Sequence, residues 1–315
     1  MRIIFAGTPD VAVPSLHTLV GSPHEVVAVI TRPDAHQGRR RALTPSPVSL
    51  AAEETGIEVL KPETPRDPQF QARLAEIAPD VVATVAYGLL IPTEALAIPR
   101  LGWINLHFSL LPTWRGAAPV QHAILAGDEV TGATVFQIVE ELDAGPIFGQ
   151  MTYTIPKRAN AGQVLHDLAT SADSLLLATL NAMEDGSAQP VAQDHRLATR
   201  APKMTDDDGR ILFDAPHLAI DRRIRATSPA PGAWTTWRGE RIALATPGTQ
   251  PGAGHKLAPG EILATKKSVW VGTLTDPLNL GDVRPAGRSG WMDAAAWARG
   301  ARIEDGERFG DHSDG

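Results

Sequence analysis

The sequence predicts an α/β fold in which a doubly wound, mostly parallel sheet is followed by a smaller C-terminal β-barrel domain. Three observations predict it. In the first part of the chain, short apolar runs alternate with helical patterns, which is typical of βαβ units. Beyond residue 190 the chain consists of short strand-like pieces separated by Pro and Gly, which is typical of a small barrel or sandwich. The length of 315 residues fits two domains of ordinary size.

Each strand and helix of the first part is indicated by its own local pattern. Ser46-Pro47 and Asp67-Pro68 indicate helix starts, because a capping side chain and a following proline both favour the first turn of a helix. The apolar spacing after Asn160 predicts a single long helix that ends at Gly186. Strands are predicted at 2–6, 25–31, 57–60, 80–86, 102–107, 133–139 and 147–155.

The domain boundary is predicted from a change of composition. Lys203–Gly209 is polar and is typical of a linker, so we expect one domain at 1–203 and a second at 204–315. The second domain carries strand-like pieces at 234–238, 241–245, 261–264 and 268–272.

Composition excludes several classes of protein. The chain has no cysteine, which excludes disulfide frameworks, cysteine-ligated zinc, iron–sulfur clusters and a thiol nucleophile. No window approaches about 18 uninterrupted apolar residues, and the apolar run at the N-terminus is too short for a secretory signal. No metal-ligand spacing is found among six of the histidines, namely His17, His24, His122, His166, His195 and His217. We therefore expect a soluble, cytoplasmic protein with no metal site and no membrane partner.

The distribution of charge keeps a nucleic-acid partner open. The net charge is −7, which by itself disfavours binding to a polyanion. The acidic residues of the second domain gather at its two ends, however, and residues 209–303 carry 13 basic and 7 acidic side chains, a net of +6. Arg39, Arg40 and Arg41 form a further basic run, which on its own is more often a solvated loop than a binding patch.

The residues most typical of catalysis lie between Gly102 and Gly145. Asn105 and His107 are two positions apart at the end of a predicted strand, so their side chains point to the same face. The carboxyl edge is also where open α/β sheets place their ligands. An amide donor beside an imidazole suits stabilisation of an oxyanion and transfer of a proton. Asp143 lies on a glycine-bounded loop between two later strands, from which a carboxylate can return to the same site.

Each of these residues also has a purely structural interpretation. A single histidine at a strand end is more often structural than catalytic, and an isolated Asn or Asp most often serves a cap or a turn. Ser109 lies near His107 but lacks the Gly-x-Ser-x-Gly elbow of a hydrolase, and Gly7–Asp10 lacks the Gly-x-Gly-x-x-Gly pattern of a dinucleotide site. Without a serine or cysteine nucleophile, the three polar residues favour direct attack by a substrate on an acyl donor.

Asn105 and His107 belong to a longer run that ends in Ser109-Leu110-Leu111-Pro112, and Arg115–Pro119 and Leu142–Gly145 follow it. Further stretches of the same kind are Ile3–Pro9, Pro45–Val48, Val85–Leu89, Ile224–Ala226 and Arg284–Gly287. Together they closely resemble the 10-formyltetrahydrofolate-dependent formyltransferases over almost the whole chain. The Asn-x-His motif with its later Asp is highly specific for that superfamily.

The resemblance implies a fold, an activity and a partner. It implies a Rossmann-like catalytic domain and an OB-like barrel that docks tRNA. The implied reaction transfers the formyl group of 10-formyltetrahydrofolate to the free α-amine of methionyl-initiator tRNA. By motif match, Asn105 and His107 would stabilise the oxyanion, and Asp143 would tune the imidazole or relay the amine proton. No metal is required, and a monomer is expected.

The resemblance also assigns binding residues. The folate pocket is expected between Ser109, Leu110, Leu111 and Pro112 on one wall and Tyr87, Gly88 and Leu89 on the other. Arg39, Arg40 and Arg41 match a loop that reaches the acceptor end of tRNA, where contacts would be electrostatic and steeply dependent on salt.

Some positions depart from the family pattern. Phe108 replaces a small residue beside the histidine, and Pro146 stands where an acidic residue is common. Asp206–Asp208 lies in a linker where lysines are common, and Leu212-Phe213 stands where an Asp-Trp pair is frequent. The catalytic three are not affected.

Three rival functions are weighed against tRNA formylation. A sugar-nucleotide amine is the alternative acceptor for the same chemistry, since such relatives can share both domains. A formyltransferase acting on glycinamide ribonucleotide would leave the second domain unexplained. An inactive RNA-binding protein on this fold is disfavoured by the intact Asn105, His107 and Asp143.

Overall fold

The computed structural model describes residues 1–37, 42–248 and 256–310, and the chain forms two compact units. The first comprises Met1–Pro119, Val130–Thr154 and Leu165–Pro202, and the second comprises Val120–Glu129, Ile155–Val164 and Lys203–Gly315. Two short segments that precede residue 203 thus group with the second unit, so a single boundary between 203 and 204 stays a prediction. No helix within the described ranges is long and apolar enough to cross a membrane.

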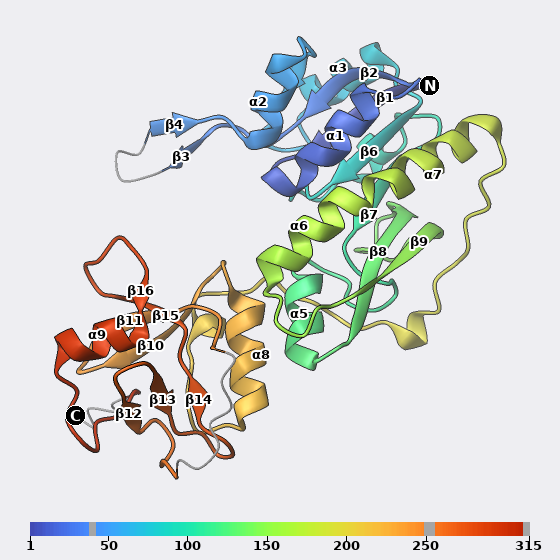
Figure 1. The fold of residues 1–315 in the computed structure, drawn as a ribbon. Helices are drawn as coiled ribbons and strands as arrows, with labels where there is room; N and C mark the ends of the chain where they lie inside the picture. The colour runs from blue at the N-terminus through green and yellow to red at the C-terminus, as the bar shows by residue number, and fades with distance from the viewer. Residues whose placement is uncertain (38–41, 249–255, 311–315) are drawn as a thin grey trace. The chain divides into compact units, whose positions relative to one another are not determined.

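A seven-stranded sheet forms the centre of the first unit (Figure 1). Its strands are β1 (Arg2–Gly7), β2 (Glu25–Ile30), β5 (Val59–Leu60), β6 (Val81–Val85), β7 (Trp103–His107), β8 (Val130–Gln137) and β9 (Ile147–Thr154). Their order is β5-β2-β1-β6-β7-β8-β9. The first five in this order are parallel, whereas β8 and β9 are antiparallel to their neighbours. The predicted mostly parallel sheet is confirmed, and each predicted strand is present with its ends shifted by a few residues.

The helices alternate with these strands along the chain, as βαβ units require. They are α1 (Val13–Val20), α2 (Pro47–Glu54), α3 (Pro68–Ile77), α4 (Thr93–Leu96), α5 (Pro119–Ala126), α6 (Ala161–Ser171) and α7 (Asp173–Asp185). The predicted starts of α2 and α3 are confirmed. The Ser46 hydroxyl accepts a hydrogen bond from the N–H of Ser49 at 3.0 Å, and the Asp67 carboxylate accepts one from Gln69 at 2.9 Å.

The prediction of one long helix up to Gly186 is wrong, because the structure divides this segment into α6 and α7 at Ala172. Hydroxyl groups just before the division explain it. Thr170 and Ser171 each donate a hydrogen bond to the carbonyl four residues earlier, at 3.0 and 2.7 Å. Such bonds compete with the backbone ladder and bend a helix. The predicted end is confirmed, since Gly186 caps α7 with a φ of 76°.

One hydrophobic core of the first unit lies between the sheet and α3. Phe70, Leu74 and Ile77 recur at helical spacing and pack against Ile4 of β1 and Ile30 of β2. Burial of this stripe holds the parallel strands in register. It therefore helps to place the carboxyl ends of β6 and β7 beside each other, where the candidate site lies.

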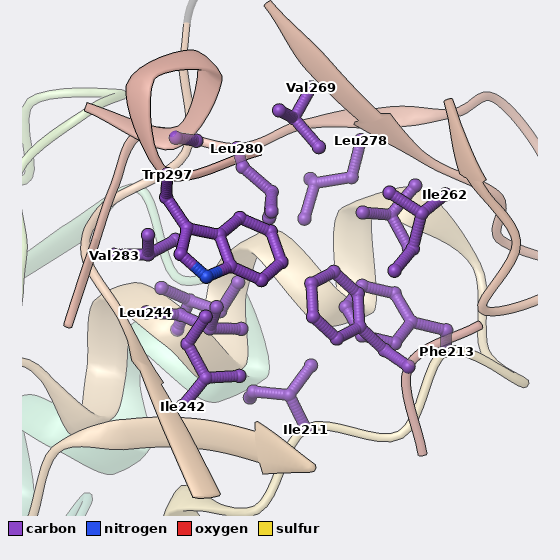
Figure 2. Close-up of a cluster of buried hydrophobic side chains, with 14 of the residues drawn as sticks. Ile211, Phe213, Ile242, Leu244, Ile262, Val269, Leu278, Leu280, Val283 and Trp297 are labelled. Atoms are coloured by element: carbon purple, nitrogen blue, oxygen red, sulfur yellow. The ribbon is translucent and has the colours of Figure 1, made fainter. Parts of the chain in front are cut away.

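Beyond residue 203, the described residues of the second unit form two small antiparallel sheets and two α-helices around one core (Figures 1 and 2). Most of α5 also groups with this unit. One sheet contains β10 (Ala233–Trp237), β11 (Glu240–Leu244), β15 (Asp282–Pro285) and β16 (Met292–Asp293), and the other contains β12 (Ile262–Ala264), β13 (Val269–Val271) and β14 (Leu278–Asn279). The helices are α8 (His217–Thr227) and α9 (Ala294–Ala301). The predicted small β domain is confirmed, whereas the sequence pattern did not predict α8 and α9.

A two-stranded ribbon was also not predicted. It consists of β3 (Ala35–Gln37) and β4 (Ala42–Thr44), which pair antiparallel with Ala35 opposite Thr44. Arg39, Arg40 and Arg41, the predicted tRNA-binding residues, lie outside the described residues.

Candidate active site

The carboxyl ends of β6 and β7 open onto a cavity of about 800 Å³ in the first unit. Its lining residues fall within 84–94, 105–108, 116–119 and 136–143, together with Arg66. Asn105, His107 and Asp143 all line it, so the structure brings the three residues singled out from the sequence to one cavity. This edge is the usual ligand site of an open α/β sheet.

His107 is buried at the cavity wall, with 6% of its surface exposed. Its Nε2 lies 2.9 Å from the carbonyl oxygen of Trp114. Because a carbonyl only accepts hydrogen bonds, Nε2 carries a proton, and Nδ1 is the basic atom of the neutral ring. Nδ1 lies 3.9 Å from Oδ2 of Asp143, and the ring packs edge-on against Phe136 at 6.3 Å between centroids. The ring is thus fixed in orientation, with its basic nitrogen next to a carboxylate.

Asp143 follows β8 on the glycine-bounded loop and is held at both its side chain and its backbone. Its Oδ2 accepts a hydrogen bond from the backbone N–H of Gly116 at 2.8 Å. Its φ of 52° lies in the left-handed region, which a residue with a side chain rarely adopts outside turns. The side chain is only 13% exposed. The loop therefore presents one carboxylate to the histidine at a defined place.

Asn105 lies two positions before His107 on β7 and lines the same cavity. It pairs with Thr84 of β6 on one side and with Phe136 of β8 on the other. Its side chain is half-buried, lines the cavity and makes no hydrogen bond to any described residue. The carboxamide is therefore available to donate hydrogen bonds to a bound molecule.

The two expected walls of the folate pocket differ in the structure. Tyr87, Gly88 and Leu89 line the cavity, whereas Ser109, Leu110, Leu111 and Pro112 are not among its lining residues. Ser109 is fully buried, and its carbonyl accepts a hydrogen bond from the Thr134 hydroxyl at 2.6 Å. Gln150 donates to the carbonyl of Leu111 at 2.9 Å. This run is bound to β8 and β9 through these hydrogen bonds, and its contact with folate stays a prediction.

Tyr87 contributes to both the cavity and the core. Its ring packs in the hydrophobic cluster that contains α3, and only 2% of its surface is exposed. Burial raises the pKa of its hydroxyl to about 12, an effect that the nearby charge of Arg32 partly opposes. The Tyr87 hydroxyl is therefore neutral near pH 7.

Sequence reasoning missed the apolar rim of the cavity. Leu90, Val139 and Leu142 line it and are 75%, 37% and 48% exposed. Exposed apolar side chains around one opening indicate an apolar ligand surface. The sequence placed Val139 at the end of a predicted strand and Leu142 in the family motif, but gave no sign that these side chains and Leu90 gather at one opening. Phe108, the departure beside the histidine, also lines the cavity and therefore affects its shape.

The arrangement suits addition of a nucleophile to a carbonyl group. An amide donor, an imidazole and a carboxylate share one wall, which is the set needed to stabilise an oxyanion and to move a proton. No group of three or more His, Cys, Asp or Glu side chains in the described part of the chain is placed to hold a metal ion. The absence of a metal from the reaction stays a prediction.

Comparisons with known proteins agree with the motifs. Residues 1–180 match the family described as formyl transferase, and residues 203–302 match the formyl transferase C-terminal domain. The methionyl-tRNA formyltransferase of Thermobifida fusca is 57% identical over 99% of this chain and 100% of that protein. That of Streptomyces coelicolor is 54% identical over 99% of this chain and 100% of that protein.

Solved structures show the same fold at much lower identity. HypX from Aquifex aeolicus in complex with tetrahydrofolic acid is 20% identical, with a TM-score of 0.66, and covers 95% of this chain and 47% of that one. Methionyl-tRNA formyltransferase from Clostridium thermocellum is 16% identical, with a TM-score of 0.57, and covers 79% of this chain and 94% of that one. The full-length sequence matches decide the assignment: the chain belongs to the methionyl-tRNA formyltransferase family.

Proposed function

We propose that this protein transfers the formyl group of 10-formyltetrahydrofolate to the free α-amino group of methionyl-initiator tRNA. The products are N-formylmethionyl-tRNA, used to initiate translation, and tetrahydrofolate. The observation that carries the proposal is the meeting of Asn105, His107 and Asp143 at one cavity wall, in a chain that is 57% identical along its length to a methionyl-tRNA formyltransferase.

The cavity fits a folate donor in size and in chemistry. Its volume of about 800 Å³ lies within the range of roughly 300–1,000 Å³ found for small-molecule sites. Leu90, Val139 and Leu142 offer apolar surface to the rings of a folate, and the polar wall lies deeper. This arrangement supports binding of the donor with its formyl group towards Asn105 and His107.

The reaction needs one bond from the formyl carbon formed, one broken, and a net transfer of one proton from the amine to N10. The α-amine forms a bond to the formyl carbon, and the formyl oxygen takes up the negative charge. Collapse of this tetrahedral species then breaks the bond from the formyl carbon to N10 of the folate. One proton leaves the amine and one reaches N10, so atoms and charge balance.

Each of the three residues has a distinct role in this reaction. The Asn105 amide donates to the oxyanion, a contact that is typically worth about 2.7–4 kcal/mol. During the reaction His107 takes up a proton at Nδ1, and the positive charge of the resulting imidazolium lies at the wall where the oxyanion develops. Asp143, 3.9 Å from Nδ1, stabilises that imidazolium and relays the amine proton. The bond from Nε2 to the Trp114 carbonyl keeps the ring from rotating during this exchange.

The second unit is proposed to dock the tRNA, which makes 1–203 a catalytic domain and 204–315 a docking domain. Its middle stretch carries the net charge of +6. Several of its arginines lie over tryptophan rings: Arg241 over Trp234 at 4.1 Å and Arg238 over Trp237 at 4.2 Å. Arginine and aromatic side chains together are typical of RNA-binding surfaces. The Arg39–Arg41 run is proposed to reach the acceptor end, in a cytoplasmic, monomeric enzyme.

Formyl transfer to three acceptors tests the proposal. Methionyl-initiator tRNA, methionyl-elongator tRNA and an amino-sugar nucleotide are each incubated with 10-formyltetrahydrofolate and the full chain. Formylation of the initiator alone supports the proposal. Formylation of the sugar nucleotide alone retains the chemistry but replaces the substrate, and no formylation of any acceptor contradicts both.

A further inference from the structure

The segment that follows α7 packs against the Asp143 loop of the candidate site and contains one buried glutamine. Gln193 is 6% exposed. Its Nε2 donates to the backbone carbonyl of Asp143 at 2.9 Å and to that of Gly145 at 2.8 Å. Its Oε1 accepts two hydrogen bonds from the Arg115 guanidinium, from Nε at 3.1 Å and from Nη2 at 2.8 Å. The whole hydrogen-bonding capacity of the carboxamide is thus used inside the protein.

We infer that Gln193 is a positioning residue, which holds the carboxylate of Asp143 at its place beside His107. The inference rests on the proposed function, because it gives the glutamine a part in formyl transfer. Gln193 is not among the lining residues of the cavity, and it binds the loop at two backbone carbonyls, so its effect passes through the backbone of the Asp143 loop.

The backbone of this loop needs such support. Asp143 has a φ of 52°, and a residue with a side chain keeps such a conformation only where its surroundings over-determine it. Gln193 holds the carbonyl groups on both sides of Ala144. The N–H of Gly116 holds the carboxylate. Asp143 is therefore fastened at two points, and only one of them is a contact of its side chain.

Arg115 joins these two points. It precedes Gly116, whose N–H binds the Asp143 carboxylate, and its guanidinium binds Gln193, whose amide binds the Asp143 carbonyl. Arg115 is nearly buried, and Glu141 at 3.2 Å is its charged partner. A charged donor makes the bonds to Gln193 stronger than neutral ones. Three chain segments thus close into one hydrogen-bonded ring around the carboxylate.

The geometry explains why this ring matters to the rate. The 3.9 Å between Nδ1 of His107 and Oδ2 of Asp143 depends on where the loop lies. A displacement of about 1 Å in a catalytic arrangement can cost about 10²-fold in rate. A loss confined to positioning lowers kcat and leaves the binding of both substrates unchanged.

The variant Gln193→Leu tests the inference, because it keeps similar volume and removes all four hydrogen bonds. We expect kcat to fall by about 10²-fold, with the KM values for 10-formyltetrahydrofolate and methionyl-tRNA unchanged. Gln137→Leu is the matched control: its Nε2 also donates to two backbone carbonyls, those of Leu101 and Trp103, and not to the Asp143 loop. The backbone bond from Gln137 N–H to the Pro146 carbonyl is kept in this variant. Its kcat should stay at the wild-type value.

A double-mutant cycle separates positioning from a general structural role. If Gln193 acts through Asp143, then Gln193→Leu has no further effect on kcat in the Asp143→Ala background. Losses that multiply, or a wild-type kcat in the single variant, overturn the inference. Should Gln193→Leu fail to fold, Gln193→Glu replaces it, because the carboxylate keeps the Arg115 bonds and loses the two donations to the loop.

A structural measurement keeps this inference distinct from the proposed function. A wild-type chain that formylates no tRNA contradicts the proposed function only. The crystal structure of Gln193→Leu then decides about the glutamine. If Asp143 then has a φ outside the left-handed region and its carboxylate has moved away from His107, the inference is supported. If the loop is unchanged, the inference is overturned.

Discussion

The cavity wall of the first unit and the core of the second unit are stabilised by opposite kinds of interaction. At the cavity wall, polar groups hold one another through directed hydrogen bonds, as between Gly116 and Asp143 at 2.8 Å. In the core of the second unit, the main contacts are between stacked apolar rings. Phe309 stacks on Phe213 at 5.7 Å and on Trp297 at 5.8 Å between ring centroids.

The two regions also differ in their backbone conformations. Ala86, Trp114 and Asp143, which lie at or beside the cavity, have φ values of 48°, 63° and 52°. Such conformations cost about 1–3 kcal/mol each and persist where function requires them. Most core residues of the second unit lie on strands and helices instead, and none of these core residues has a positive φ. The cavity wall therefore lowers the free energy of unfolding in order to keep a fixed geometry, whereas burial of apolar rings in the second unit raises it.

Removal of the imidazole should produce the largest effect, and it should change catalysis without changing the binding of tRNA. His107→Ala is expected to lower kcat by about 10²–10⁴-fold, because both the proton carrier and the positive charge are lost. Binding of methionyl-tRNA should be unchanged, since the change lies inside the cavity. Steady-state kinetics and a tRNA-binding titration measure the two quantities. A collapse of tRNA binding would instead make His107 a structural residue.

Removal of the Trp297 indole from the core of the second unit should instead lower stability without changing the binding of folate. Trp297→Ala is expected to lower the free energy of unfolding by about 3–5 kcal/mol, since a large buried ring leaves a cavity. Folate binding by the protein that remains folded should be unchanged. Urea unfolding and a folate titration test both, with Leu218→Ala as the control because Leu218 is 64% exposed. A weaker folate affinity at full folding would contradict the separation.

A steric change at the site should affect both properties. Gly116→Ala places a Cβ 2.5 Å from the carbonyl oxygen of Ala201, at a φ of 128°. We expect a loss of more than about 1 kcal/mol in stability, with a lower kcat because Gly116 holds Asp143. Gly56→Ala is the control for strain alone, because Gly56 has a φ of 69° and no atom within 4 Å of the added Cβ. Unfolding and kinetics that match this control would show that the close approach to Ala201 is unimportant.

The smallest expected effect concerns the pH dependence of stability at the base of the sheet. Burial alone would raise the pKa of Asp80, but the N–H of Arg2 at 2.8 Å and the guanidinium of Arg100 at 2.7 Å hold it below its ordinary value. A carboxyl whose pKa is lower in the folded state stabilises the fold above its unfolded pKa, and this contribution is lost as the pH falls through the folded pKa.

Asp80→Asn should therefore lower stability at pH 7 and flatten its decline in acid. The expected difference is on the order of 1 kcal/mol, because Arg100 is mostly exposed and its charge is screened by solvent. Urea unfolding at several pH values between 7 and 3 measures it. A parallel decline in wild type and variant would assign the acid sensitivity to other carboxyl groups.

Local patterns predicted the elements whose causes are local. The starts of α2 and α3 are confirmed because a capping side chain acts on its own first turn, as Ser46 does on Ser49. The inner strands of the sheet, such as β1 and β6, are confirmed because a buried strand needs a continuous apolar run, and β9 is confirmed because a half-exposed strand alternates. The division of α6 from α7 was missed, since the effect of Thr170 and Ser171 depends on where their hydroxyls point.

The sequence by itself determined that Asn105 and His107 share one face of a strand, because side chains two positions apart always do. It also determined the family, through motifs that span the chain. Only the tertiary structure decided where the carboxylate lies. Asp143 is 27 residues from Gly116 and 50 residues from Gln193, which bind it. No local pattern encodes such contacts, because they exist only once the strands have paired and the loops between them have packed.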